Sequence, residues 1–284
     1  MAKPLSWQKY SRNSFKDDLL KIERFLRSRE NVCAGACAKF LNASFSRIWA
    51  YHDKYNDIAA LVLYSRSSLF SVFSGTDIIP LPFFFNRFLG RSSIYSIQGL
   101  TKDVVLLEKG MEKNGFIAAD TIDYNLMTLD VLPSADCFLN APPDLMLRPP
   151  LPSDREELFL LHSAYEKEEV IPKHGFFNPA SSRKTLERLL DGEKMLIASL
   201  GSKIVGKINT NATSFTKYQI GGVYVLPEFR GLGIAKIMSA SFLKELIIGG
   251  MGVNLFVKKR NTAAYKLYQR LGFSVLGDYR ISYY

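Results

Sequence analysis

The sequence is poor in the residues that build disulfide frameworks and metal sites. It has three cysteines and three histidines in 284 residues. Three cysteines cannot all pair, and no second Cys or His cluster completes a zinc site with Cys33 and Cys37. We therefore expect buried free thiols, a reducing cytoplasmic location and no metal.

Long apolar runs are also missing. No run reaches the roughly 18 residues that a membrane-spanning helix needs. The segment Met1–Leu20 lacks the apolar core of a secretory signal. The most apolar stretch, Ile78–Leu89, contains two prolines and is expected to be a buried core segment. The sequence thus predicts neither a signal nor a membrane partner.

The remaining composition is that of a globular protein, with 47% hydrophobic and 23% charged residues. A net charge of +10 suits nucleic acid, an anionic membrane or a polyanionic cofactor. Because lysine and arginine are dispersed, and their tightest cluster is only Lys258–Arg260, we expect no nucleic-acid partner. Nucleic-acid binding is kept as the lesser alternative.

A proline-rich stretch divides the chain. Residues 141–152 include five prolines, which block helix and favour extended backbone. We place a domain boundary near residue 140, giving domains 1–140 and 141–284. A domain of about 140 residues can fold alone, so a fragment from Ala141 to Tyr284 is expected to keep its own core.

Hydrophobic periodicity predicts an α/β fold with mixed sheets in both halves. In the first half we expect helices over 14–29, 34–41 and 102–114, the last capped by Thr101, and strands over 48–51, 58–64, 69–73, 93–98 and 123–129. In the second half we expect helices that Ser153 and either Ser181 or Ser182 cap, helices over 233–248 and 262–271, a hairpin of strands 195–200 and 204–211, and strands over 144–148, 219–225, 253–257, 273–276 and 280–283. The first half shows no catalytic motif.

The segment from Val223 to Lys236 carries the chemistry. A buried strand ends at Val225, Pro227 breaks it, and a glycine turn opens into a helix. The start of a helix presents unpaired N–H groups and partial positive charge, so this arrangement suits a phosphate. A lone Gly-x-Gly often only turns the chain. The Gly-Lys-Ser/Thr end of a P-loop is absent, as is the third glycine of a dinucleotide fingerprint.

Two motifs resemble those of the GNAT superfamily of N-acyltransferases. The first, Arg230-Gly-Leu-Gly-Ile-Ala235, matches the family pattern of Arg or Gln, two residues, Gly, one residue, and Gly or Ala. The second runs from Asn261 to Phe273 and ends in Leu-Gly-Phe, in the order that the family uses. The resemblance covers about half of the chain and implies the GNAT fold there. The first half is expected to be an α/β domain. One interpretation makes it a degenerate copy of the GNAT fold, and in that role the first half would shape the acceptor cleft.

The resemblance also implies roles for individual residues. The backbone of Val223, Tyr224 and Val225 would bind the pantetheine arm of acetyl-CoA. The backbone N–H groups from Arg230 or Gly231 onward, through Leu232, Gly233, Ile234, Ala235 and Lys236, would bind its pyrophosphate, Asn261 would contact it further along, and Tyr268 would protonate the leaving thiolate. Plainer interpretations stay open: Tyr224 as a strand residue, Asn261 as a helix cap, and Tyr268 as core packing with Tyr265 as its rival.

The implied activity is N-acetyl transfer to a primary amine by direct attack, because no Ser-His-Asp or Cys-His set suggests a covalent intermediate. The oxyanion would meet a strand N–H near Val225. Candidate bases are Glu166, Glu168, Glu169 and His174. The alternative interpretation is that the three glutamates form a solvated helix end and that His174 is an ordinary loop residue. The acceptor is a small-molecule or peptide amine: an amino acid, polyamine, aminoglycoside or protein terminus. A non-catalytic acyl-CoA-binding or sensor module is the main alternative.

Overall fold

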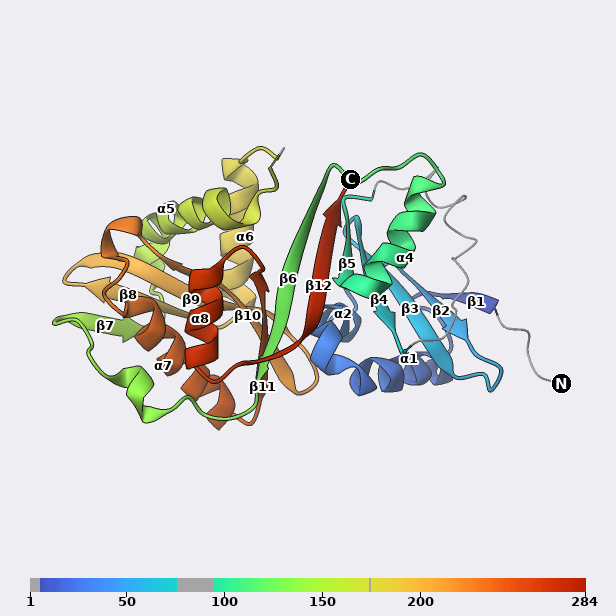
Figure 1. The fold of residues 1–284 in the computed structure, drawn as a ribbon, viewed down its shortest axis with the longest axis horizontal. Coiled ribbons are helices and arrows are strands. Elements are labelled where there is room, and N and C mark those ends of the chain that lie inside the picture. Colours follow the sequence, from blue (N-terminus) through green and yellow to red (C-terminus); the bar gives the residue numbers. More distant parts are fainter. Residues whose placement is uncertain (1–5, 76–93, 174) are drawn as a thin grey trace. The chain divides into compact units, whose positions relative to one another are not determined.

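The computed structural model describes residues 6–75, 94–173 and 175–284, so Ile78–Leu89 and His174 lie outside the described residues. The fold is α/β with mixed sheet, as predicted (Figure 1). Internal contacts divide the chain into two compact units. The N-terminal unit is Met1–Leu126 with Leu276–Tyr284, and the C-terminal unit is Met127–Val275. The sequence places the division near residue 140, and that domain boundary stays a prediction.

The N-terminal unit builds its sheet in the order β1-β2-β3-β4-β5-β12, followed by the first part of β6. Strand β4 pairs antiparallel with β3 and parallel with β5. Its elements are β1 (Ser6–Tyr10), α1 (Lys16–Ser28), α2 (Glu30–Leu41), β2 (Arg47–His52), β3 (Ile58–Ser65), β4 (Ser68–Phe73), β5 (Ser96–Leu100), α4 (Thr101–Glu112), the start of β6 (Asp120–Leu129) and most of β12 (Ser274–Tyr283).

The C-terminal unit continues from the end of β6 in the order β6-β11-β10-β9-β8-β7. Strand β10 pairs antiparallel with β9 and parallel with β11. Its elements are β7 (Leu145–Arg148), α5 (Arg155–Tyr165), the π-helical turn η3 (Glu166–Val170), α6 (Pro179–Gly192), β8 (Met195–Leu200), β9 (Lys203–Thr213), β10 (Lys217–Val225), α7 (Ile234–Ile248), β11 (Gly252–Lys258) and α8 (Thr262–Arg270).

The two halves of the chain repeat one order of elements among the described residues. Each begins with a strand and two helices, has three antiparallel strands and then a strand parallel to the third, and ends with a helix and a strand. In the second half α7 precedes the parallel strand, and the corresponding stretch of the first half lies outside the described residues. The first strand is β1 in one half and β7 in the other. The order of elements therefore supports the interpretation of the first half as a copy of the second.

Alternation along β8 divides the core of the C-terminal unit between the two faces of its sheet. Leu196 and Ala198 join the cluster beneath α7 and α8, whereas Met195 and Ile197 join the cluster beneath α5 and α6. Successive strand residues point to opposite faces, so these helix pairs cover opposite sides of the sheet. The site is built where both layers meet the ends of β10 and β11.

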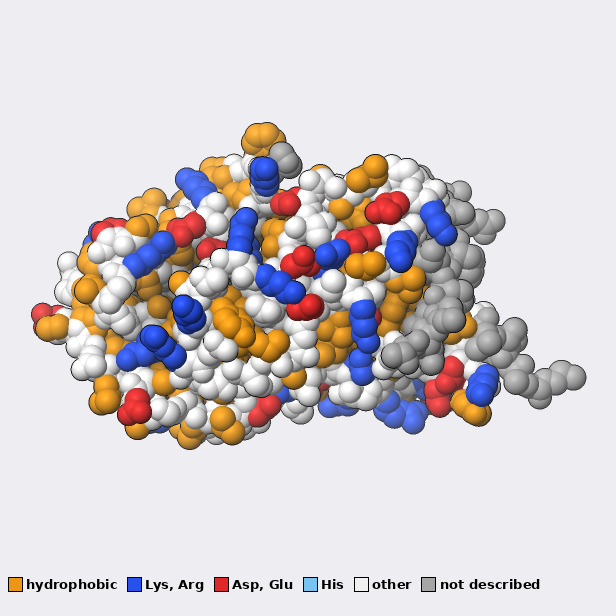
Figure 2. All heavy atoms as spheres, in the orientation of Figure 1, with side chains coloured by type: hydrophobic (Ala, Val, Ile, Leu, Met, Phe, Trp, Pro, Cys, Tyr) orange, Lys and Arg blue, Asp and Glu red, His pale blue; other side chains and the backbone are white. Residues whose placement is uncertain are grey.

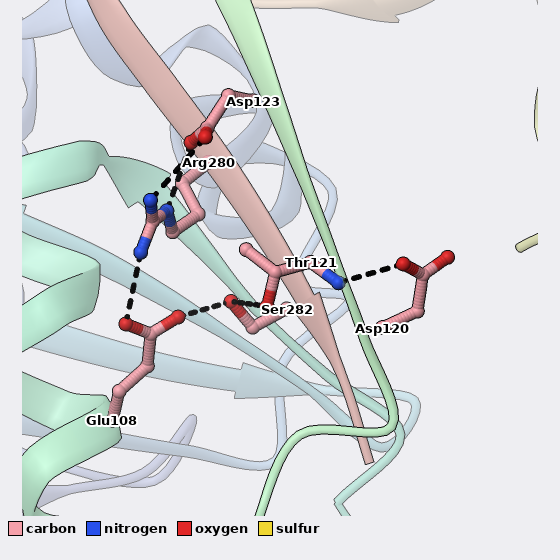
Figure 3. A network of polar contacts seen from close by, with 6 residues as sticks. All are labelled: Glu108, Asp120, Thr121, Asp123, Arg280 and Ser282. Carbon is pink, nitrogen blue, oxygen red and sulfur yellow. Dashed lines mark hydrogen bonds and ion pairs between the residues drawn. The ribbon is translucent and has the colours of Figure 1, made fainter.

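Charged side chains tie β12 into the N-terminal unit (Figure 3). The Arg280 guanidinium donates to Asp123 through Nε at 2.9 Å and to Glu108 through Nη1 at 3.2 Å. Ser282 donates to the other oxygen of Glu108, and Thr121 donates to Ser282. These contacts hold the end of β12 beside β6 and α4.

Several sequence predictions need correction. The final pair of strands, 273–276 and 280–283, is the single strand β12, because its outer part pairs with β5 without a turn. Thr101 is the first helical residue of α4 and not its cap. Strand β1 was not expected at all.

The two predicted serine caps are also wrong. Asn178 caps α6 by accepting from the Ser181 N–H at 3.0 Å. At the start of α5, Asp154 accepts from the Leu151 N–H, so Ser153 is not needed as a cap. The Asn178 side-chain oxygen thus satisfies a free N–H group in the first turn of α6, whereas no side chain caps α5.

All three cysteines are buried and free, as predicted. None of the helices in the described ranges is both long and apolar enough to cross a bilayer. On the face shown in Figure 2, lysine and arginine side chains are scattered among acidic, apolar and neutral groups.

Candidate functional site

The two central parallel strands of the C-terminal unit separate at their ends. Their pairing runs from Lys217–Gly252 to Ile220–Leu255, although β10 continues to Val225 and β11 to Lys258. On its other edge, β10 stays paired with β9, apart from register shifts between Gln219 and Ile220 and between Gly221 and Tyr224. The predicted cofactor-binding backbone, Val223 to Val225, thus belongs to the part of β10 that no longer pairs with β11.

The glycine loop leads directly into α7. Gly231 and Gly233 have φ values of +82° and +77°, a left-handed conformation that side chains disfavour. The first helical bond is donated by the Ile237 N–H to the Gly233 carbonyl. From Gly231 to Lys236, no backbone N–H has a partner among the described residues. The Arg230 N–H already donates to Pro227, so the run of available donors begins at Gly231.

The Arg230 side chain is directed back toward the strand. Its Nε donates to the Val225 carbonyl at 3.0 Å and its Nη2 to Glu168 at 2.8 Å. Glu168 also accepts from the Tyr224 hydroxyl at 2.9 Å. Arg230 therefore fixes the position of the loop against the end of β10 and lowers the pKa of Glu168.

The three candidate glutamates lie together on the π-helical turn η3, a type of turn that often marks functional sites. Glu166 lies 3.3 Å from the buried His162 ring. Burial, the largest single influence, raises the pKa of Glu166, but His162, Ser182 and Lys207 together outweigh it and the pKa is lowered. Lowered pKa values make Glu166 and Glu168 weak bases.

Asn261 and Glu169 connect the turn to α8. The Asn261 carbonyl oxygen caps α8 by accepting from the Ala264 N–H at 3.0 Å. Its amide donates to Glu169 at 3.2 Å, and Lys258 lies 3.3 Å from the same carboxylate. Asn261 thus has the cap role, and it also brings η3 close to the end of β11.

Tyr268 is buried at 7% exposure and packs edge-on against Phe273. Its hydroxyl has no hydrogen-bond partner among the described residues. Burial, then Tyr165 and Glu169, raise its pKa well above the usual range. The rival, Tyr265, already accepts a hydrogen bond from Gln269. The Tyr268 hydroxyl is thus without a partner among the described residues, whereas the Tyr265 oxygen accepts one hydrogen bond and keeps its own proton to donate.

A buried lysine beside this site was missed in the sequence. Lys207 on β9 is fully buried, and its Nζ lies 4.6 Å from the centre of the Tyr165 ring. Burial lowers its pKa to about 7. The sequence Lys-Ile-Val-Gly-Lys gave no signal for this, because lysine on a strand is usually read as solvent-facing.

Residues 156–273 match the Acetyltransferase (GNAT) family. The C-terminal half is a GNAT domain. No curated protein matches the sequence at a significant level.

Solved structures resemble the whole chain. A Drosophila protein has a TM-score of 0.67 at 12% identity, with 99% of both chains covered. A GNAT-family acetyltransferase from Colwellia psychrerythraea has a TM-score of 0.60 at 10% identity, covering 97% of this chain and 98% of its own. A tandem GNAT protein of the clavulanic acid pathway has 0.61 at 11%, covering 99% and 98%. At such identities the likeness concerns the fold, and GNAT-like architecture extends over both halves.

Proposed function

We propose that this protein is an N-acetyltransferase that moves the acetyl group of acetyl-CoA to a primary amine by direct attack. The run of free N–H groups from Gly231 to Lys236 carries the proposal. It opens a helix beside the unpaired end of β10, so one edge offers donors for a pyrophosphate and extended backbone for an amide-bearing arm.

In this mechanism the pyrophosphate binds the N–H groups of Gly231, Leu232, Gly233, Ile234, Ala235 and Lys236. The pantetheine arm pairs with the backbone of Val223, Tyr224 and Val225. The amine nitrogen attacks the thioester carbon and a C–N bond forms. The nitrogen then releases one proton to solvent, and the C–S bond breaks as the tetrahedral oxyanion collapses. Strand N–H groups near Val225 stabilise that oxyanion. Arg230 and Asn261 hold the loop and the turn in position.

Tyr268 protonates the departing thiolate. Because its pKa is raised, the hydroxyl keeps its proton throughout the neutral range and has no competing partner among the described residues. Its position near Glu169 links it to the turn η3, where we place the acceptor amine.

The proposal is tested by thiol release from acetyl-CoA with a panel of amines: amino acids, a polyamine, an aminoglycoside and a peptide with a free N-terminus. Thermal unfolding with acetyl-CoA is measured in parallel, since a ligand at 100 times its Kd stabilises the fold by about 2.7 kcal/mol. We expect stabilisation and thiol release with at least one amine. Stabilisation without release would favour a sensor module, and the absence of both would overturn the proposal.

A further inference from the structure

Lys207 is buried without a carboxylate at salt-bridge distance among the described residues. Its Nζ donates instead to the Asn209 side-chain oxygen at 3.0 Å and to the Gly222 carbonyl at 3.1 Å. A neutral amine has two N–H donors, and here each has an acceptor. A buried lysine is costly to the fold, so this arrangement calls for a role beyond packing.

Lys207 lies opposite a β-bulge in β10 and contacts it. Asn209 pairs with Gly221 and Lys207 with Tyr224, so β10 has one more residue than β9 across this step. Gly222 in the bulge has φ +61°, and an added Cβ would collide with Asn209 Oδ1 and Lys207 Nζ. Glycine is required here because its backbone is left-handed and because Asn209 and Lys207 occupy the space that a side chain would need.

The bulge lies at the point where β10 leaves β11. It follows Ile220, the last residue of β10 to pair with β11, and precedes Val223–Val225. Gly222 is held through its carbonyl, which accepts from Lys207 Nζ, and that Nζ also lies against the Tyr165 ring. These contacts set the direction in which the strand continues.

We propose that Lys207 is a positioning residue for acyl transfer: by holding the Gly222 carbonyl, it keeps Val223–Val225 in the course that receives the acyl end of the cofactor. This inference rests on the proposed function. The lowered pKa of Lys207 agrees with it, because the neutral amine becomes accessible near pH 7.

The test compares Lys207→Met with Lys217→Met in the full chain. Lys217 is another buried lysine. It begins β10, at the end of that strand away from Val223–Val225, and its Nζ contacts Thr128 and Asp130. Calorimetry gives the Kd of CoA, and thiol release gives kcat and KM for acetyl-CoA. We expect kcat of Lys207→Met to fall about 100-fold, as a small misplacement of reacting groups can do.

The same variant should weaken CoA binding far less than it lowers kcat, by no more than about 10-fold, because the glycine loop that holds the pyrophosphate is unchanged and only the pantetheine contacts with Val223–Val225 shift. Lys217→Met should keep both values. Wild-type kcat in Lys207→Met, or an equal loss in both variants, would overturn the role of Lys207. If the wild-type protein neither binds nor turns over acetyl-CoA, the proposed function fails instead.

If Lys207→Met does not fold, Gly222→Ala takes its place. It keeps the lysine but forces a methyl group against its Nζ. We expect the same loss of kcat with CoA binding retained, and wild-type kcat in this variant would also overturn the proposal.

Discussion

Replacing Lys207 with methionine should change how stability depends on pH. Burial lowers the folded-state pKa of Lys207 from 10.5 to about 7. Between these values the unfolded chain carries a proton that the folded chain lacks, so stability rises with pH across this window. Below pH 7 and above pH 10.5 Lys207 carries the same charge in both states, so it no longer makes the free energy of unfolding depend on pH.

The size of the effect follows from the width of the window. One proton contributes about 1.4 kcal/mol per pH unit, so wild type should gain roughly 2 to 3 kcal/mol from Lys207 between about pH 7.5 and 9.5. Lys207→Met should gain nothing from this source. The titratable groups that face Lys207 are His162, Tyr165, Glu166 and Tyr224, and both proteins contain them, so they largely cancel in the difference.

The assay is urea unfolding across this pH range. Both tryptophans, Trp7 and Trp49, lie in the N-terminal unit, so their fluorescence follows that unit, and circular dichroism adds the C-terminal one. Lys194→Met is the control, because the contact with Glu245 raises the pKa of Lys194 and keeps it charged in both states over this range. Parallel wild-type and Lys207→Met curves would refute a neutral buried lysine.

Three further predictions concern the site and the fold. Gly233→Asp should abolish stabilisation by acetyl-CoA, since a side chain and a negative charge would enter the pyrophosphate path; an unchanged thermal shift would place the cofactor elsewhere. Tyr268→Phe should lower kcat by about 10²- to 10⁴-fold with little change in acetyl-CoA affinity; wild-type kcat would make Tyr265 the next candidate. Arg280→Met should destabilise the N-terminal unit by about 1 to 3 kcal/mol in fluorescence-detected urea unfolding, because Glu108 is mostly buried and loses its charged partner, keeping only Ser282. The exposed Arg27→Met should cost under about 0.5 kcal/mol, and equal losses would contradict the argument.

The glycine loop could be predicted because the residues that determine its conformation are neighbours in the sequence. A strand, a proline, two glycines and a helix follow one another within Val223–Lys236, and each residue type dictates its own backbone geometry. The structure shows this order, with left-handed Gly231 and Gly233.

Features that depend on distant partners could not be predicted. Lys207 reads as a surface residue until the bulge opposite it is known. The strand Ser6–Tyr10 lacks an alternating apolar pattern and forms by pairing with β2.

A fragment from Ala141 would omit Met127, Leu129 and Cys137, which are buried in the core of the C-terminal unit. We therefore expect a fragment to need residue 127 as its start.

The exchange of β12 into the N-terminal unit has a consequence for synthesis. The C-terminal unit uses one continuous segment, 127–275, and can complete its core once that segment has emerged from the ribosome. The N-terminal unit emerges first, but its segment 276–284 is synthesised last. Before that segment emerges, Glu108 and Asp123 lack Arg280 as a partner. The edge of β5 is also unpaired during this time, and other chains can add to it. The half that begins synthesis should therefore be the half that finishes folding last.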